Sequence, residues 1–216
     1  MQARDGEDKS SLLLLAKDYQ GYLQLCELLT EAYLQSENTE AASVSWQALT
    51  KLTGGHLICL SGAAQGLVGY YFIKGKKDKA RALACELNAI FQDNFYLEIQ
   101  RWVDVSLPGV DESNQRAMQR LQKNIEINLH GSLALAKELD LPLVATHPIE
   151  FLNPEDFLAH EVKVCITQGG VLEDPQRPHS FYPGQYFLSA DVMEALFADI
   201  PSALINAGEI AKRCTV

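Results

Sequence analysis

The chain has 216 residues, of which 47% are hydrophobic, and its 28 acidic residues outnumber 18 lysines and arginines, which gives a net charge of −10. This length and hydrophobic content suffice for a sizeable core in one large or two small domains, and they exclude a chain that is disordered throughout. The negative charge argues against a stand-alone nucleic-acid binder, because phosphate contacts require clustered lysines and arginines.

The first predicted element is a helix. Ser10 and Ser11 can cap a helix that begins at Leu12, and apolar residues follow near a 3.6-residue period up to Tyr33, with Gly21 as a break between two helical pieces. No strand is predicted before residue 57. Residues 45–50 predict a short helix that is ended by a Gly-Gly pair.

From residue 57 onward, predicted strands alternate with predicted helices. Short apolar runs predict strands at 57–60, 95–99 and 141–145, and the intervening sequence predicts helices at 66–74, 76–91 and 112–139. In the second strand, the odd-numbered residues from Phe95 should face one side of the sheet, and Tyr96 and Glu98 should face the other. Helices between successive strands indicate parallel strands, so we predict the α/β fold class.

The last third of the chain mixes helices with loops. A helix follows the start signal at 153–156, and it carries His160 and Glu161. Residues 169–187 read as a loop, Ser189 caps the next helix, and Pro201 opens the final helix. The aromatic stretch RPHSFYPGQYF within this loop either docks a partner or packs onto its own domain.

The cysteines and the amino-terminal residues bear on the cellular compartment. The five cysteines, at 26, 59, 85, 165 and 214, are widely spaced without a CxxC motif, which predicts reduced thiols. No apolar run approaches the roughly 20 residues that span a bilayer. The charged start, MQARDGEDKS, is not a signal peptide. We therefore expect a cytoplasmic protein without membrane contact.

The strongest candidates for chemistry follow the predicted strand ends. They are Glu98, His147, Glu150 and His160, with Glu161 nearby, and histidines with carboxylates can form zinc, manganese or acid–base sites. No HxH or HxxxH pair occurs, so a metal site would have to be assembled from separate elements. The competing interpretation is a set of polar loop residues that bind the backbone. The Ser61–Gly66 turn is a weak phosphate-binding candidate that lacks a lysine, and a tight turn explains it better.

Six segments of the chain, in order, resemble the PHP (polymerase and histidinol phosphatase) domain of bacterial replicative DNA polymerase III alpha subunits, in its proteobacterial type. The segments are SLLLLAKDYQGYLQLCELLTEAYL, GGHLICLSGAAQGLVG, NFYLEIQR, LDLPLVATHPIEFLNPEDFLAHEVKVCI, LEDPQRP and LFADIPSALINAGEIAKRC. The resemblance implies a distorted (β/α)₇ TIM-like barrel that lacks its N-terminal strands in this chain. It divides the chain into a polar segment at 1–10, a barrel portion at 11–168, and a loop-rich and helical part at 169–216 that leads toward the polymerase palm.

The same resemblance implies that an ancestral metal site has been lost. Metal-binding members hold metal at the carboxyl ends of the strands, and some are 3′–5′ exonucleases. Ser11 and Pro148 stand where those members have ligands, Glu150 stands where they have a histidine, and Trp102 stands where many have a histidine. The resemblance therefore implies no metal ligand, cofactor-binding residue or catalytic residue here, with Glu98, His147, Glu150 and His160 as remnants of a degenerate site.

The implied function is that of a catalytically silent part of a DNA-directed DNA polymerase, a nucleotidyltransferase whose Mg²⁺ chemistry lies elsewhere in the parent polypeptide. The chain would be a scaffold and a docking platform for the proofreading exonuclease subunit, epsilon. It would contact the rest of the alpha subunit and, through it, the replisome and DNA. The alternative is a residual metal-dependent phosphoesterase or 3′–5′ exonuclease that uses Zn²⁺ or Mn²⁺ in a rearranged site.

Overall fold

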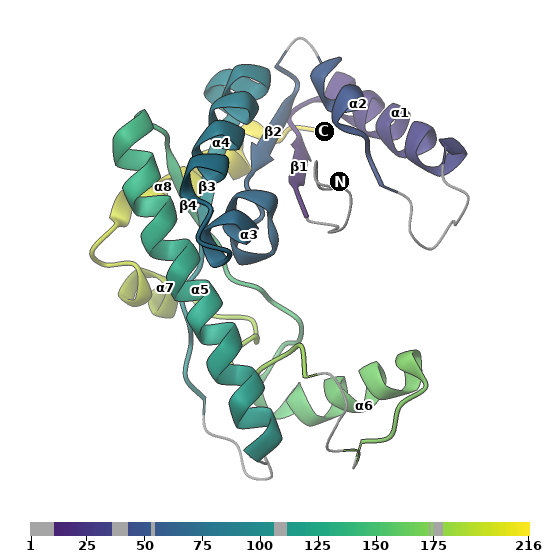
Figure 1. Ribbon diagram of the computed structural model, residues 1–216, viewed down its shortest axis with the longest axis vertical. Coiled ribbons are helices and arrows are strands. Elements are labelled where there is room, and N and C mark those ends of the chain that lie inside the picture. Colours follow the sequence, from purple (N-terminus) through teal and green to yellow (C-terminus); the bar gives the residue numbers. More distant parts are fainter. Residues whose placement is uncertain (1–10, 36–42, 53–54, 106–111, 173, 175–178) are drawn as a thin grey trace.

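The structure, a computed structural model, describes residues 11–35, 43–52, 55–105, 112–172, 174 and 179–216 (Figure 1). Its strands form one sheet in the order β1-β2-β3-β4. β1 (Leu13–Ala16) runs antiparallel to β2 (Leu57–Leu60), whereas β2, β3 (Phe95–Ile99) and β4 (Leu143–Ala145) are mutually parallel. The predicted α/β class and the three predicted strands with their parallel order are confirmed.

The start of the chain differs from the prediction, because residues Leu13–Ala16 form a strand and not the first turn of a helix. A short, uniformly apolar run suits a buried strand as well as a helix, and here pairing with β2 decides the outcome. The helix α1 (Tyr19–Gln35) begins after Asp18, whose Oδ1 accepts a hydrogen bond from the N–H of Gly21 at 2.9 Å. The Asp18 side chain therefore satisfies an N–H of the first turn.

Gly21 does not divide α1, contrary to the prediction. It is buried, and a Cβ atom added there would lie 2.2 Å from the carbonyl oxygen of His56. The glycine therefore allows α1 to approach the backbone that leads into β2, and its role is close packing instead of a helix break.

Helices cover both faces of the sheet. On one face, Cys59 of β2 and Leu97 of β3 pack against α3 (Leu67–Ile73), α4 (Lys77–Phe91) and α5 (Glu112–Leu139). On the other face, Tyr96 and Val144 pack against Ile210 of the last helix. The opposite orientations predicted for Leu97 and Tyr96 are confirmed. The other helices are α2 (Trp46–Thr50), α6 (Phe157–Gln168), α7 (Ala190–Leu196) and α8 (Pro201–Arg213).

Three predicted helix starts in the last third of the chain are confirmed. The side chain of Ser189 accepts a hydrogen bond from the N–H of Val192 at the start of α7, and Pro201 occupies the first turn of α8. Asn153 and Asp156 form the reciprocal capping box that precedes α6. These contacts join residues three positions apart, so the local sequence suffices to specify them.

The sheet is open within the described part of the chain, and the closed barrel that the resemblance implies stays a prediction, as does the boundary at residue 168. At the β4 edge, the carbonyl of Leu143 accepts a hydrogen bond from Asn206 Nδ2 of α8 at 2.7 Å. Figure 1 shows that α6 extends away from the sheet, below the amino-terminal elements. Among the described residues, no helix is long and apolar enough to span a bilayer.

Candidate functional site

A buried carboxylate joins the ends of the parallel strands. Glu98, near the end of β3, is only 5% exposed. Its Oε1 accepts hydrogen bonds from the Thr146 hydroxyl at 2.5 Å and from the Gln100 amide at 3.4 Å, and its Oε2 accepts one from the N–H of Gly62 at 3.1 Å. Burial raises the pKa of Glu98, and these donors offset part of that effect. The carboxylate thus connects the segments that follow β2, β3 and β4.

Three further buried polar residues hold the backbone of Glu98 in place, two of them directly and one through its neighbour. The Ser61 hydroxyl accepts a hydrogen bond from the N–H of Glu98 at 2.9 Å, and Asn128 of α5 donates to the carbonyl of Glu98 at 3.3 Å. Ser132 in turn donates to Asn128 at 3.4 Å. This support was not predicted from the sequence. The one sequence feature that could have indicated it is the spacing of Asn128 and Ser132, which lie four residues apart on one face of the long helix.

The candidates after β4 are bound by the loop at 182–186. His147 Nε2 lies 2.9 Å from the carbonyl oxygen of Gly184, and the carbonyl of Pro148 accepts a hydrogen bond from Gln185 Nε2 at 3.2 Å. The N–H of Glu150 donates to the carbonyl of Gln185 at 2.8 Å. Burial lowers the pKa of His147. Because residues 182–185 are buried, the described part of the aromatic stretch, residues 179–187 (the aromatic loop), packs onto its own domain, as one of the two interpretations predicted; residues 177 and 178 lie outside the described residues.

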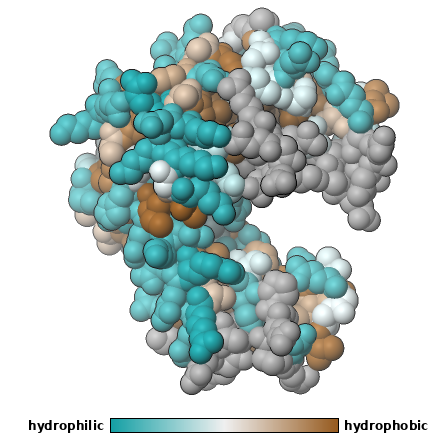
Figure 2. Space-filling model, in the orientation of Figure 1, coloured by the Kyte–Doolittle hydropathy of each residue, from teal (hydrophilic) through white to brown (hydrophobic). Residues whose placement is uncertain are grey.

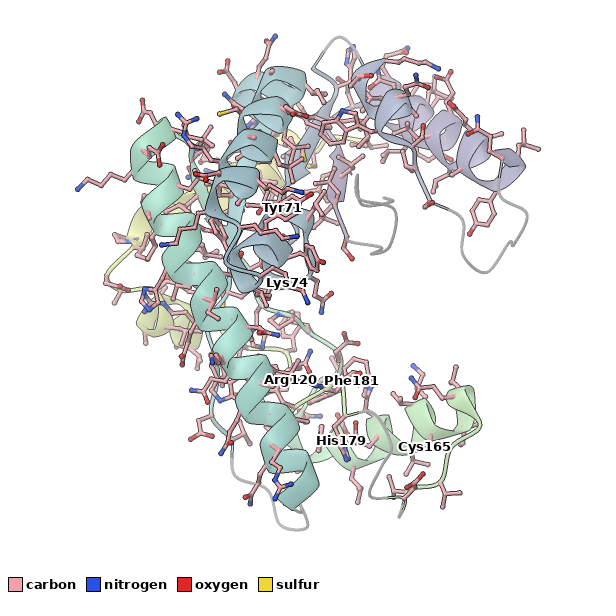
Figure 3. The ribbon with its side chains drawn as sticks, viewed as in Figure 1. Tyr71, Lys74, Arg120, Cys165, His179 and Phe181 are labelled. Carbon is pink, nitrogen blue, oxygen red and sulfur yellow. The ribbon has the colours of Figure 1, made fainter. Side chains whose placement is uncertain are left out.

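His160 and Glu161 have different surroundings from Glu98. The ring of His160 contacts Phe181 edge-on, with ring centroids 4.5 Å apart, and also contacts Phe151. Glu161 is 1% exposed, and its Oε2 lies 3.6 Å from His179 Nδ1. Figure 3 shows His179 and Phe181 beside α6. These contacts attach the aromatic loop to α6, a role that the sequence did not indicate for His179.

The positions at which the resemblance implies lost ligands lie near the strand ends. Ser11, just before β1, lies against the turn that follows β2, and its N–H donates to the carbonyl of Gln65 in that turn at 3.1 Å. The carbonyl oxygen of Ser11 lies 2.5 Å from the place that a Cβ on Gly62 would occupy. Trp102, beyond β3, stacks on Tyr182 with ring centroids 3.8 Å apart. The N–H of Gly62 is occupied by Glu98, and its Cα lies close to the backbone of Ser11. These contacts favour the tight turn over the phosphate site as the interpretation of residues 61–66.

The metal site that the resemblance implies for active members does not fit these residues. Across the ranges that the structure describes, no group of three or more His, Cys, Asp or Glu side chains could hold a metal ion. Both oxygens of Glu98 are engaged by donors of the chain itself. The arrangement can stabilise the strand ends, and we derive no metal-dependent step from it.

The amino-acid sequence of the chain is similar to that of known proteins. Residues 1–102 match the PHP domain family. The chain is 42% identical over 214 residues to DNA polymerase III subunit alpha of Neisseria meningitidis serogroup B. The aligned region covers 98% of this chain and 17% of that protein. It is 37% identical to the subunit of Pseudomonas aeruginosa and 36% identical to that of Escherichia coli K12, over 96% and 98% of this chain and 16% and 17% of those proteins. The chain therefore spans about a sixth of the length of these relatives.

Proposed function

We propose that this chain, which belongs to the PHP domain family and is related to proteobacterial DNA polymerase III alpha subunits, is the PHP portion of a replicative polymerase and provides it with a scaffold. The observation that carries this proposal is the state of Glu98. A carboxylate that served a metal would offer its oxygens to the ion, whereas those of Glu98 accept bonds from Gly62 and Thr146. We infer that the strand ends now serve stability and that docking is the remaining task.

The surface that best suits docking is one face of α6, which we call the α6 face. Leu158, Val162 and Ile166 recur every four residues, so they share one side of the helix, and they are 61%, 39% and 77% exposed. Leu152, just before the helix, is 71% exposed. Figure 2 shows hydrophobic residues at the lower right, where α6 ends. Exposed apolar patches of this kind mark protein interaction sites. The occupant that the family suggests is the proofreading exonuclease subunit, epsilon.

This docking is tested by measuring the affinity of the chain for the epsilon-type exonuclease of the same organism, by calorimetry. We expect a one-to-one complex for the wild type. Ile166→Glu should weaken it at least tenfold, because a charge would be buried at the interface. Gln168→Glu is the matched control, since it adds the same charge to an exposed polar position on the same helix. A wild-type chain that does not bind the exonuclease would refute docking.

The competing function is a residual Zn²⁺- or Mn²⁺-dependent phosphoesterase that uses Glu98, His147, Glu150 and His160. Elemental analysis of the purified chain and turnover of a generic phosphoester, with and without a chelator, separate the two functions. The scaffold proposal expects no chelator-sensitive turnover. Stoichiometric metal together with turnover that the chelator abolishes and Glu98→Gln removes would overturn it.

A further inference from the structure

A pocket of about 430 Å³ lies beyond the carboxyl end of β3. Its wall combines residues from the segment after β3, from the amino-terminal half of α5 and from the aromatic loop. Open α/β sheets bind ligands beyond the carboxyl ends of their strands, and this volume lies within the range of small-molecule sites. The lining residues are Trp102, Val103, Asp104, Val105, Gln115, Met118, Gln119, Gln122, Tyr182 and Pro183.

The aromatic side of this pocket is preorganised. The rings of Trp102 and Tyr182 stack with centroids 3.8 Å apart and planes 17° apart. Tyr182 is 2% exposed, and its hydroxyl has no hydrogen-bond partner among the described residues. A buried hydroxyl without a partner is unfavourable, so a ligand acceptor that displaced the atoms covering it and bonded to it would gain affinity. Burial also raises the pKa of Tyr182, which keeps the hydroxyl protonated as a donor.

The opposite side of the pocket is lined by amides. Gln115, Gln119 and Gln122 lie at intervals of four and three residues, so they point from one side of α5. Each amide has both donor and acceptor capacity. Gln122 donates to Glu126 at 3.1 Å, which leaves its carbonyl oxygen as an acceptor. Among the lining residues that the structure describes there is no lysine or arginine, and the one charged side chain is that of Asp104.

We propose that this pocket binds a nucleobase. A flat heterocycle can stack against the aromatic wall. The donors and acceptors on its edge can form hydrogen bonds with the glutamine amides, as glutamine side chains do with bases in other proteins. The described lining offers no cation to a phosphate and includes the acidic Asp104, so the base itself is the recognised group. The proposal uses only the residues of the pocket and does not depend on the docking role of the α6 face.

Tryptophan fluorescence tests this proposal directly. The chain has two tryptophans, so Trp46→Phe leaves Trp102 as the only reporter. Titration of this variant of the 216-residue chain with adenosine or cytidine should quench Trp102 saturably, with affinity in the millimolar range. In that background, Tyr182→Phe keeps the ring and removes the hydroxyl, and it should weaken binding about tenfold. Gln119→Leu should also weaken binding, whereas Gln168→Leu, at an exposed position on α6, should not.

The outcomes are distinguishable even if Tyr182→Phe fails to fold, because Gln119 is exposed and its replacement does not disturb the core. Adenosine 5′-monophosphate should bind no more tightly than adenosine. Quenching that does not saturate, equal affinity in the Gln119→Leu variant, or a clear preference for the monophosphate would each overturn the proposal.

Discussion

The hydroxyl of Thr146 donates a hydrogen bond to the carboxylate of Glu98 at 2.5 Å, and this contact joins the end of β4 to the end of β3. The same carboxylate reaches the N–H of Gly62 after β2. A single buried side chain thus connects the three parallel strands at their carboxyl ends. This relationship gives Glu98 a structural role at the carboxyl ends of the strands.

Thr146→Val should destabilise the chain, because it removes the donor and leaves a buried carboxylate oxygen with weaker compensation. The expected loss in free energy of unfolding is about 1–3 kcal/mol, measured by urea denaturation at neutral pH. The control is Thr167→Val, whose hydroxyl binds a carbonyl on the exposed surface of α6. Equal stability of the two variants would show that the contact with Glu98 contributes nothing.

The raised pKa of Glu98 predicts how stability depends on pH. The folded state holds the Glu98 proton more tightly than the unfolded state, in which the pKa is near 4.5. Protonation of this group therefore stabilises the fold below pH 4.5, and that stabilisation is lost as the pH rises through the raised folded pKa. His147 acts in the opposite sense, because its pKa is lowered from 6.5, so stability is lost as the pH falls below that value.

Glu98→Gln isolates the contribution of the carboxylate. The free energy of unfolding of the variant minus that of the wild type should increase with pH above 4.5, because only the wild type acquires a buried charge. Urea denaturation at several values between pH 4 and pH 8 measures this difference. A difference that stays constant over that range would contradict the raised pKa.

Gly21→Ala should be destabilising, although alanine is favoured over glycine in helices by about 1 kcal/mol. The added Cβ would lie 2.2 Å from the carbonyl oxygen of His56, so α1 or the loop before β2 would have to move. We expect a net loss of about 1–3 kcal/mol. In Gly208→Ala, on α8, the Cβ meets no atom within 4 Å, and this variant should be more stable than the wild type by about 0.5–1 kcal/mol. Thermal melting of both variants tests the pair.

Arg101 should hold α7 in place against the end of the sheet. It donates to the carbonyl of Leu196 at 2.8 Å and to Asp199 at 2.6 Å, and its guanidinium lies over the ring of Phe197. Arg101→Leu should lower the free energy of unfolding by about 1.5 kcal/mol, since it removes a charge-assisted hydrogen bond in a partly buried position. Arg81→Leu, which breaks an exposed pair with Glu138, should have a smaller effect in the same denaturation experiment.

The sequence by itself determined the features that depend on neighbouring residues. Strands β2 and β3 were predicted at the observed residues, and the starts of α7 and α8 followed from Ser189 and Pro201. Six short segments also sufficed to indicate the family that the comparisons support. Caps, apolar runs and periodicity act within a few residues, so they can be read without a structure.

The tertiary structure alone decided which distant residues meet. Leu13–Ala16 became a strand because β2 lies beside it, and Gly21 proved to be a packing position because His56 approaches it. Glu98, His147, Glu150 and His160 looked like one cluster in the sequence. In the fold, Glu98 binds Thr146 and Gly62, whereas His160 packs on Phe181. A buried polar group takes its role from the donors that reach it, and those donors come from other elements of the chain.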